Sequence, residues 1–76
     1  MSYGYSLTTV QRNREADGDK LGVALGRVCI ERCIPVSEVA KRLRVTRPTI
    51  YNWFEGTCAP SAGLENEVAS YLASLQ

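Results

Sequence analysis

The sequence predicts an all-α fold, a small domain of four to five helices. Two features indicate this fold class. Apolar residues recur at positions i, i+3, i+4 and i+7 in successive segments, which is the spacing of one face of a helix. Residues that begin or end helices separate these segments, chiefly Pro35, Pro48, Gly56 and Pro60. With 76 residues, the chain is expected to form one domain with a modest core.

Residues 1–19 are predicted to form an N-terminal arm, flexible or docked on a partner, outside a helical domain of residues 20–76. The arm is polar and mixed in charge, and it shows no helical periodicity. From Tyr3 to Thr9, larger residues alternate with smaller or polar ones, which is the period of a strand. A lone strand is not stable in water. The arm is therefore expected to stay flexible, to pair with another chain or to pack on the domain.

The first helix of the domain is predicted from about Lys20 to Arg32, with Asp17 or Asp19 as its cap. Gly22 and Gly26 each cost about 1 kcal/mol relative to Ala in a helix, so this helix depends on tertiary packing. Its apolar stripe consists of Leu21, Ala24, Leu25 and Val28.

A second helix is predicted from about Val36 to Leu43. A third starts at Thr46-Arg47-Pro48, with either Thr46 or Arg47 as its cap, and ends at Gly56. The inward residues of the second helix are Val36, Val39, Ala40 and Leu43. At 100° per residue, one side of the third helix gathers Thr49, Ile50 and Trp53, with Phe54 at its boundary. The opposite side carries Arg47, Pro48, Tyr51, Asn52 and Glu55.

A last helix is predicted from a Ser61 cap to about Leu75, with Leu64, Val68, Tyr71 and Leu75 on its apolar stripe. Phe54, Tyr71 and Leu72 are expected to be half-buried or to form a dimer interface.

The composition excludes several function classes. The chain has no His, which removes the commonest general base and metal ligand. It also lacks a nucleophile elbow, a glycine-rich phosphate loop and a cluster of carboxylates, so neither an enzyme nor a cofactor is expected. Cys29 and Cys33 lie four residues apart and can both touch one metal, but no second pair completes a zinc site. These two thiols and Cys58 are expected to be small, buried or half-buried, reduced and without a metal.

Net charge is only +1, so charge alone does not indicate a nucleic-acid partner. The distribution is more informative. Between Val36 and Gly56 there are four basic residues against two acidic ones. The basic ones are Lys41, Arg42, Arg44 and Arg47.

Two short helices joined by a tight turn predict a helix-turn-helix. The close crossing of the helices requires a small residue in the first, which is Ala40. The second helix must offer hydrogen-bonding or basic residues to the major groove, and Arg47, Tyr51 and Asn52 satisfy this condition.

The segment VSEVAKRLRVTRPTIYNWFEGTCAP resembles the helix-turn-helix of the phage Cro and C1 repressor (XRE-like) family. The residues that carry the resemblance are Val39, Ala40, Val45, Thr46, Ile50, Trp53, Gly56 and Pro60. The resemblance covers about Lys20 to Pro60 and, more loosely, the last helix. It implies a lambda-repressor-like domain that binds double-stranded DNA, represses transcription and forms a homodimer.

Three positions depart from the family pattern. Arg44 occupies the turn position where the family often has Gly, so a left-handed conformation there would cost about 1–2 kcal/mol. Pro35 stands where a Ser or Thr cap is common. Pro48 replaces a residue that often reads a base edge, and it offers only apolar contact, for example to a thymine methyl group.

We assign site roles on this basis. Base contacts are predicted for Arg47 to guanine, Asn52 to adenine, Pro48, and Tyr51, which can also stack on a sugar or bond a phosphate. Arg12 and Arg14 of the arm can enter the adjacent minor groove. Glu55 would repel phosphate, or it holds Tyr51 or Arg47 in place. The predicted phosphate contacts are Lys41, Arg42, Arg44, Thr46 and Thr49.

Dimerisation is expected through the last helix, by Tyr71, Leu72 and Leu75, or through the arm. The alternative function is a protein-binding module that uses the same fold to engage a host or phage protein such as RNA polymerase. Near-neutral charge and Pro48 favour this alternative. No membrane span or signal peptide is recognisable, so the cytoplasm of a bacterial or infected host cell is the expected location.

Overall fold

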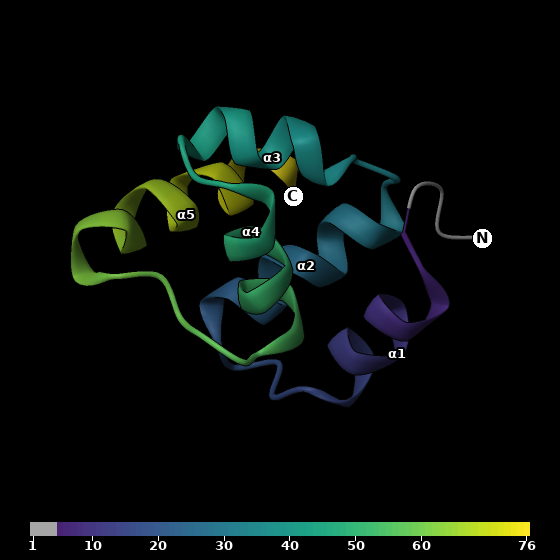
Figure 1. Ribbon diagram of the computed structural model, residues 1–76. Coiled ribbons are helices and arrows are strands. Elements are labelled where there is room, and N and C mark those ends of the chain that lie inside the picture. The colour runs from purple at the N-terminus through teal and green to yellow at the C-terminus, as the bar shows by residue number, and fades with distance from the viewer. Residues whose placement is uncertain (1–4) are drawn as a thin grey trace.

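The computed structural model describes residues 5–76, which form five α-helices and, within that range, no strand. The all-helical fold class predicted from the sequence is confirmed. The helices are wound into a compact bundle around a shared core (Figure 1). Their bounds are α1 Leu7–Glu15, α2 Leu21–Glu31, α3 Val36–Leu43, α4 Arg47–Glu55 and α5 Ala62–Leu75.

The helix α1 is the main departure from the predicted organisation. The sequence predicted a strand-like segment from Tyr3 to Thr9. From Leu7 onward the chain instead forms a helix, which packs against α2 and α4. The Ser6 hydroxyl caps this helix by accepting a hydrogen bond from the Thr9 N–H at 3.2 Å. Of the alternatives for this segment, packing on the domain is the one that residues 5–15 adopt, although as a helix and not as a strand. Residues 1–4 of the predicted arm, with Tyr3 among them, lie outside the described residues.

The buried residues of α1 are polar and Val10 is the half-buried apolar residue that packs against the core, which explains why apolar periodicity did not reveal this helix. Thr9 and Asn13 are buried and point into the structure, one helical turn apart. Tyr5 continues the same line into the core and donates a hydrogen bond to the carbonyl of Ile34. The helix is held by hydrogen bonds as well as by packing.

The centre of the domain is α2, which packs against α1, α4 and α5. Val23, Leu25 and Cys29 are fully buried on it. Its two glycines explain the close approach of α4. A Cβ atom on Gly22 would lie 2.8 Å from the Cβ of Trp53, and one on Gly26 would lie 2.8 Å from the Cγ of Phe54. Such distances are too short for real Cβ atoms.

The turn between α3 and α4 has the tight geometry that the sequence predicted. Arg44 adopts the left-handed conformation, with φ 60° and ψ 42°. The Val45 N–H donates to the Ala40 carbonyl at 3.0 Å and closes the end of α3. Thr46 is the N-cap of α4, and Gly56 ends that helix at φ 80°. A second left-handed residue, Cys33 at φ 59°, follows α2 and was not predicted.

Three predicted caps behave differently from the expectation. No side chain caps α2, and the Asp17 carboxylate instead accepts a hydrogen bond from the Asp19 N–H at 2.9 Å. Thr46 and Ser61 occupy the N-cap positions of α4 and α5, but neither side chain makes a capping hydrogen bond. In α5 the Ser61 carbonyl accepts the first hydrogen bonds of the helix.

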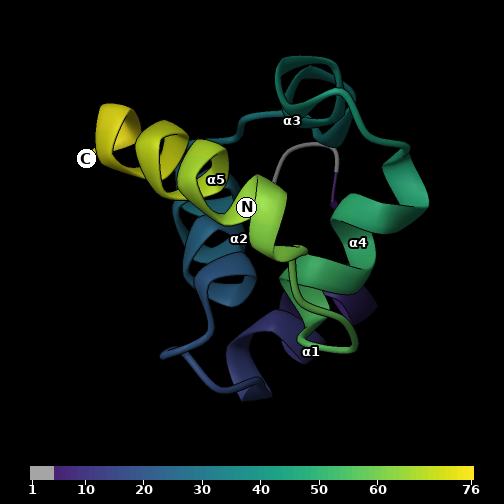
Figure 2. The same ribbon diagram turned by 90° about the vertical axis from the view of Figure 1, so that its left-hand side faces the viewer.

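The last helix, α5, lies against α2 and the end of α3 (Figure 2). Val68 and Tyr71 are buried on it, and Leu72 and Leu75 are half-buried against the core. Phe54 is also fully buried. Tyr71 and Phe54 are therefore core residues, so neither is available as the predicted dimer contact. Among the described helices, none combines the length and the apolar character that crossing a membrane requires.

Candidate nucleic-acid interface

One side of α4 is in the core and the other is open to solvent. Ile50, Trp53 and Phe54 are buried, with exposed fractions of 0%, 3% and 0%. The opposite side carries the four predicted base-contacting residues. Arg47, Pro48 and Asn52 are exposed, and Tyr51 is half-buried. The structure thus places these four side chains on one surface, which we call the α4 face.

The first turn of α4 carries a hydrogen bond between two threonine side chains. The Thr46 and Thr49 hydroxyl groups lie 2.9 Å apart and share one hydrogen bond. Thr46 is exposed and Thr49 half-buried. The hydroxyl that accepts within this pair keeps its own proton, which it can donate to an incoming phosphate oxygen.

A shallow hollow of about 200 Å³ connects the α4 face with the start of α3. It is lined by Pro35, Val36, Ser37, Arg47 and Tyr51. Sequence reasoning did not single out Ser37, since a serine in the first turn of a helix is ordinary. Its place beside Arg47 could be recognised only from the packing of α3 on α4.

The basic residues of α3 are divided between two sides of that helix. Lys41 is exposed and follows Ser37 by four residues, so it lies on the side of α3 that borders the α4 face. Arg42 lies on the other side, where its guanidinium carbon is 5.6 Å from the centre of the Tyr71 ring.

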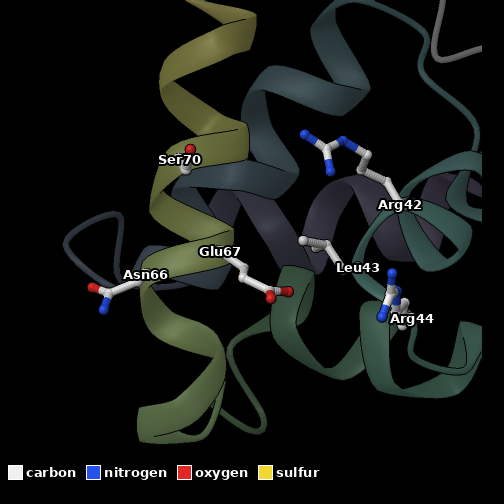
Figure 3. Close-up of a pocket in the computed structure, with 6 residues that line it drawn as sticks. All are labelled: Arg42, Leu43, Arg44, Asn66, Glu67 and Ser70. Atoms are coloured by element: carbon white, nitrogen blue, oxygen red, sulfur yellow. The ribbon is translucent and has the colours of Figure 1, made fainter.

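Arg42 and Arg44 line a second hollow, of about 400 Å³, between the end of α3 and α5. The other lining residues are Leu43, Asn66, Glu67 and Ser70. In Figure 3 the Glu67 side chain extends from α5 toward α3, and Arg42 extends toward α5. The predicted group of phosphate contacts is therefore not continuous. Lys41, Thr46 and Thr49 adjoin the α4 face, whereas Arg42 and Arg44 adjoin α5.

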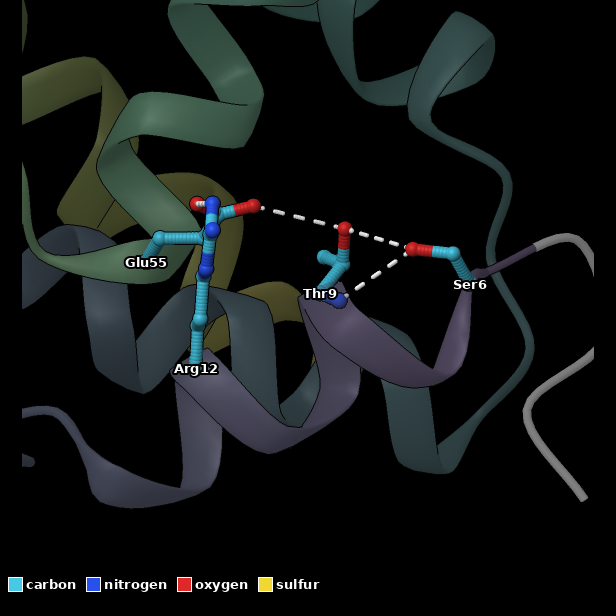
Figure 4. A network of polar contacts seen from close by, with 4 residues as sticks. All are labelled: Ser6, Thr9, Arg12 and Glu55. Atoms are coloured by element: carbon cyan, nitrogen blue, oxygen red, sulfur yellow. Dashed lines mark hydrogen bonds and ion pairs between the residues drawn. The ribbon is translucent and has the colours of Figure 1, made fainter.

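Glu55, at the end of the α4 face, is held by α1. Arg12 Nη1 lies 3.2 Å from Glu55 Oε1 in an ion pair, and the Thr9 hydroxyl donates to Glu55 Oε2 at 3.3 Å (Figure 4). The Ser6 hydroxyl donates in turn to Thr9 Oγ1 at 3.0 Å. The prediction that Glu55 holds Tyr51 or Arg47 is wrong, because its two oxygens are occupied by α1.

The arginines expected in a minor-groove arm are helical instead. Both Arg12 and Arg14 lie in α1, which packs on the domain. The Arg14 carbonyl accepts a hydrogen bond from Arg27 Nη2 at 3.2 Å, which ties the end of α1 to α2. Neither residue belongs to an extended segment that could enter a groove.

Asn13 is the buried polar group that fastens α1 to α4. Its Nδ2 donates to the Phe54 carbonyl at 2.6 Å and to the Val23 carbonyl at 3.2 Å. Its exposed fraction is 3%. Asn13 was absent from the predicted site, and the signal that could have revealed it is its spacing of four residues from Thr9.

The groups with shifted pKa values lie in the core and not on the α4 face. Burial raises the pKa of the Cys29 thiol to about 12, with a smaller contribution from Glu38. Burial also raises the pKa of Tyr5 and that of Tyr71 above the usual value for a phenol. These groups stay protonated at neutral pH, so they support packing and no charge on the α4 face depends on them.

The described residues contain no group of three or more His, Cys, Asp or Glu side chains that could hold a metal ion. Cys29 is buried as expected, whereas the expectation is wrong for Cys33 and Cys58, which lie in the segments that follow α2 and α4 and are exposed. Comparisons of the chain with models of protein families, with curated proteins and with solved structures found no match.

Proposed function

We propose that this protein is a sequence-specific regulator that binds double-stranded DNA by inserting α4 into the major groove. The proposal includes the resemblance to the Cro and C1 repressor family and, with it, repression of transcription in a phage or bacterial setting. The protein would then act in the cytoplasm of a bacterial or infected host cell, without a cofactor.

The observation that carries the proposal is the α4 face itself. Arg47 and Asn52 are exposed on the side of α4 opposite three buried apolar residues, so the helix is fixed to the core while its polar side is free. A helix of this kind fits the width of the major groove. Arg47 has the geometry for a bidentate contact to guanine, and Asn52 for one to adenine.

Two further residues of the α4 face have narrower roles. Tyr51 is half-buried against the core, so part of its side chain remains open to contact a sugar or phosphate. Pro48 has no N–H to donate and contributes apolar contact to a thymine methyl group.

Phosphate contacts would come from the rim of the α4 face. Lys41, Thr46 and Thr49 border it, and Ser37 adds a hydroxyl at the start of α3. Such contacts fix the orientation of the domain on the duplex and carry no sequence preference.

The electrostatics of the α4 face support an anionic ligand. Glu55 is the acidic residue of this surface, and its carboxylate is paired with Arg12. The pair removes most of the repulsion that Glu55 would exert on a phosphate backbone. The charged residues of α4 are Arg47 and Glu55. Because Glu55 is paired with Arg12, the charge that the α4 face presents to a ligand is the positive charge of Arg47.

A single module of this size buries limited DNA surface, so tight specific binding calls for a dimer on two half-sites. With Tyr71 in the core, the parts of Leu72 and Leu75 left open on α5 remain as candidate contacts for a homodimer.

The proposal is tested by selection from a random duplex pool, with the retained DNA sequenced at two salt concentrations. We expect an enriched motif, in two half-sites about one helical turn apart if the protein is a dimer, and retention that falls steeply with salt. Salt-sensitive retention without an enriched motif would indicate an auxiliary DNA-binding protein. No retention at either salt concentration would contradict DNA binding.

A second candidate function is binding of another protein, such as host RNA polymerase, through the same fold. The observation that favours it is the position of Arg42 and Arg44, which lie with Glu67 around the hollow beside α5 and away from the α4 face. Salt separates the two functions. A protein contact of mixed charge would depend on salt weakly, whereas release of counterions makes DNA binding fall steeply.

A further inference from the structure

Arg12 lies at the end of the α4 face although it comes from a different helix. Glu55 follows Asn52 by three residues and Tyr51 by four, so it continues the line of exposed residues along α4. Arg12 Nη1 lies 3.2 Å from Glu55 Oε1. Through this ion pair, α1 adds a guanidinium group to a surface that is otherwise built from α3 and α4.

The two members of the pair are exposed to different extents. The Arg12 side chain is 63% exposed, whereas that of Glu55 is 14% exposed. Both carboxylate oxygens of Glu55 are engaged, one by Arg12 and the other by the Thr9 hydroxyl (Figure 4). A guanidinium group has five N–H donors, so one contact to Glu55 leaves donors for a ligand. The positive group thus faces solvent and the negative group faces α1.

We propose that Arg12 is a phosphate-binding residue, oriented at the end of the α4 face by Glu55 and, behind it, Thr9. The inference rests on the DNA binding proposed above. A recognition helix reads bases with its N-terminal residues, so its C-terminal end lies toward the edge of the groove, where a phosphate strand runs. Arginine suits that position, because its planar donors match phosphate oxygens in a bidentate contact.

This role explains the presence of an acidic residue on a surface that is proposed to meet DNA. Glu55 alone would oppose a phosphate. As the partner of Arg12, it limits the rotamers of a long side chain before DNA arrives, so less side-chain entropy is lost on binding. Glu55 is then a positioning residue, and Arg12 is the residue that touches the ligand.

The test uses the full chain and the DNA motif enriched in the selection. The variants are Arg12→Ala and Arg12→Gln, and the matched control is Arg14→Ala. The control removes the same charge from the same helix, but residue 14 lies about 200° around α1 from residue 12. Arg12→Gln keeps a side-chain donor for Glu55 while removing the charge, which separates the role in binding from the role in folding.

We expect both Arg12 variants to reduce the slope of log affinity against log salt by about 0.9, the value for one phosphate contact on duplex DNA. At 0.15 M salt the affinity should fall about fivefold for all DNA sequences alike. Arg14→Ala should leave the slope unchanged, and circular dichroism should show that all three variants are folded.

Two results would overturn the inference while leaving the proposed function intact. One is that the wild-type protein binds DNA and that Arg12→Gln shows the same slope of log affinity against log salt as the wild type. The other is an equal loss of slope in the Arg12 variants and in Arg14→Ala, which would indicate a diffuse effect of net charge. Absence of DNA binding by the wild-type protein would contradict the proposed function itself, and the phosphate site with it.

Discussion

The first and last turns of α4 differ in how they are held. At the first turn, the hydrogen bond between side chains is the one shared by Thr46 and Thr49, and Arg47 and Pro48 are exposed. The last turn is fastened from two other helices. Asn13 donates to the Phe54 carbonyl, α1 holds Glu55, and Lys20 Nζ donates to the Gly56 carbonyl at 3.2 Å.

This difference shows how a small domain can present a polar helix end without losing its fold. The hydrogen bonds that fasten α4 to α1 and to the start of α2 lie at its last turn, whereas the buried side chain of Ile50 positions the first turn. The exposed side chains of the first turn, Arg47 and Pro48, therefore take no part in holding the helix. Substitutions at the two ends should therefore separate stability from binding.

The largest loss of stability is expected from Asn13→Ala. Removing the buried amide leaves the Phe54 carbonyl without its partner and opens a cavity, so the free energy of unfolding should fall by about 3 kcal/mol. Urea denaturation measures this loss. The control is Asn52→Ala on the exposed side of α4, which should change stability by less than about 0.5 kcal/mol. Equal effects of the two substitutions would mean that α1 does not anchor the last turn.

The next largest effect is expected from Gly26→Ala, which tests the close approach of α2 to the last turn of α4. The new Cβ would lie 2.6 Å from Asn13 Nδ2 and 2.8 Å from the Cγ of Phe54. Overpacking should outweigh the gain in helix propensity and lower the free energy of unfolding by about 1–2 kcal/mol.

Gly63→Ala is the matched control for Gly26→Ala. Apart from its neighbours in the chain and the backbone of α5 itself, no atom of the described residues lies within 4 Å of a Cβ at this position, so the substitution should raise stability by up to about 1 kcal/mol. Thermal unfolding of both variants shows the sign directly. A stabilising Gly26→Ala would contradict the tight packing of α2 on α4.

The first turn should give the opposite result to the last. Arg47→Ala should leave stability within about 0.5 kcal/mol, since the side chain is exposed, and should cost about 1–3 kcal/mol of DNA binding with a relaxed preference at one base pair. Lys41→Ala is the comparison, because loss of a phosphate contact weakens binding to all sequences alike. Competition binding against single-base variants of the operator distinguishes the two substitutions. If Arg47→Ala and Lys41→Ala showed the same base preferences, the division between base and phosphate contacts would be contradicted.

The sequence predicted α2 to α5 well because these helices carry apolar stripes and are separated by Pro and Gly residues. The end of α4 at Gly56 followed from the same patterns. The left-handed conformation of Arg44 was considered only as a condition, because the resembled family often has Gly at this position. The helix α1 could not be predicted in this way, because both of its buried residues are polar. Thr9 and Asn13 are four residues apart, but a search for apolar periodicity counts neither of them and finds only Val10 beside them.

The candidate site was predicted in part. The exposed residues of α4 follow from helical geometry alone, so they could be found from the sequence. The division of the basic residues of α3, with Lys41 toward α4 and Arg42 toward α5, depends on how three helices pack. The pairing of Glu55 with Arg12 joins residues 43 apart in the chain, and a local pattern cannot predict it.

The smallest effect is expected at the turn that precedes α4. Arg44 holds a left-handed conformation that costs a non-glycine residue about 1–2 kcal/mol. Arg44→Gly should remove this strain, but the added freedom of the unfolded chain offsets part of the gain, so the free energy of unfolding should rise by about 0.5–1 kcal/mol. Lys41→Gly lies within α3, the helix that Arg44 ends, where the backbone is right-handed. This substitution should lower the free energy of unfolding by about 1 kcal/mol. Urea midpoints that move in opposite directions would show that the turn before α4 stores backbone strain. If both variants are destabilised, the contacts of the Arg44 side chain beside α5 stabilise the fold by more than its left-handed backbone costs.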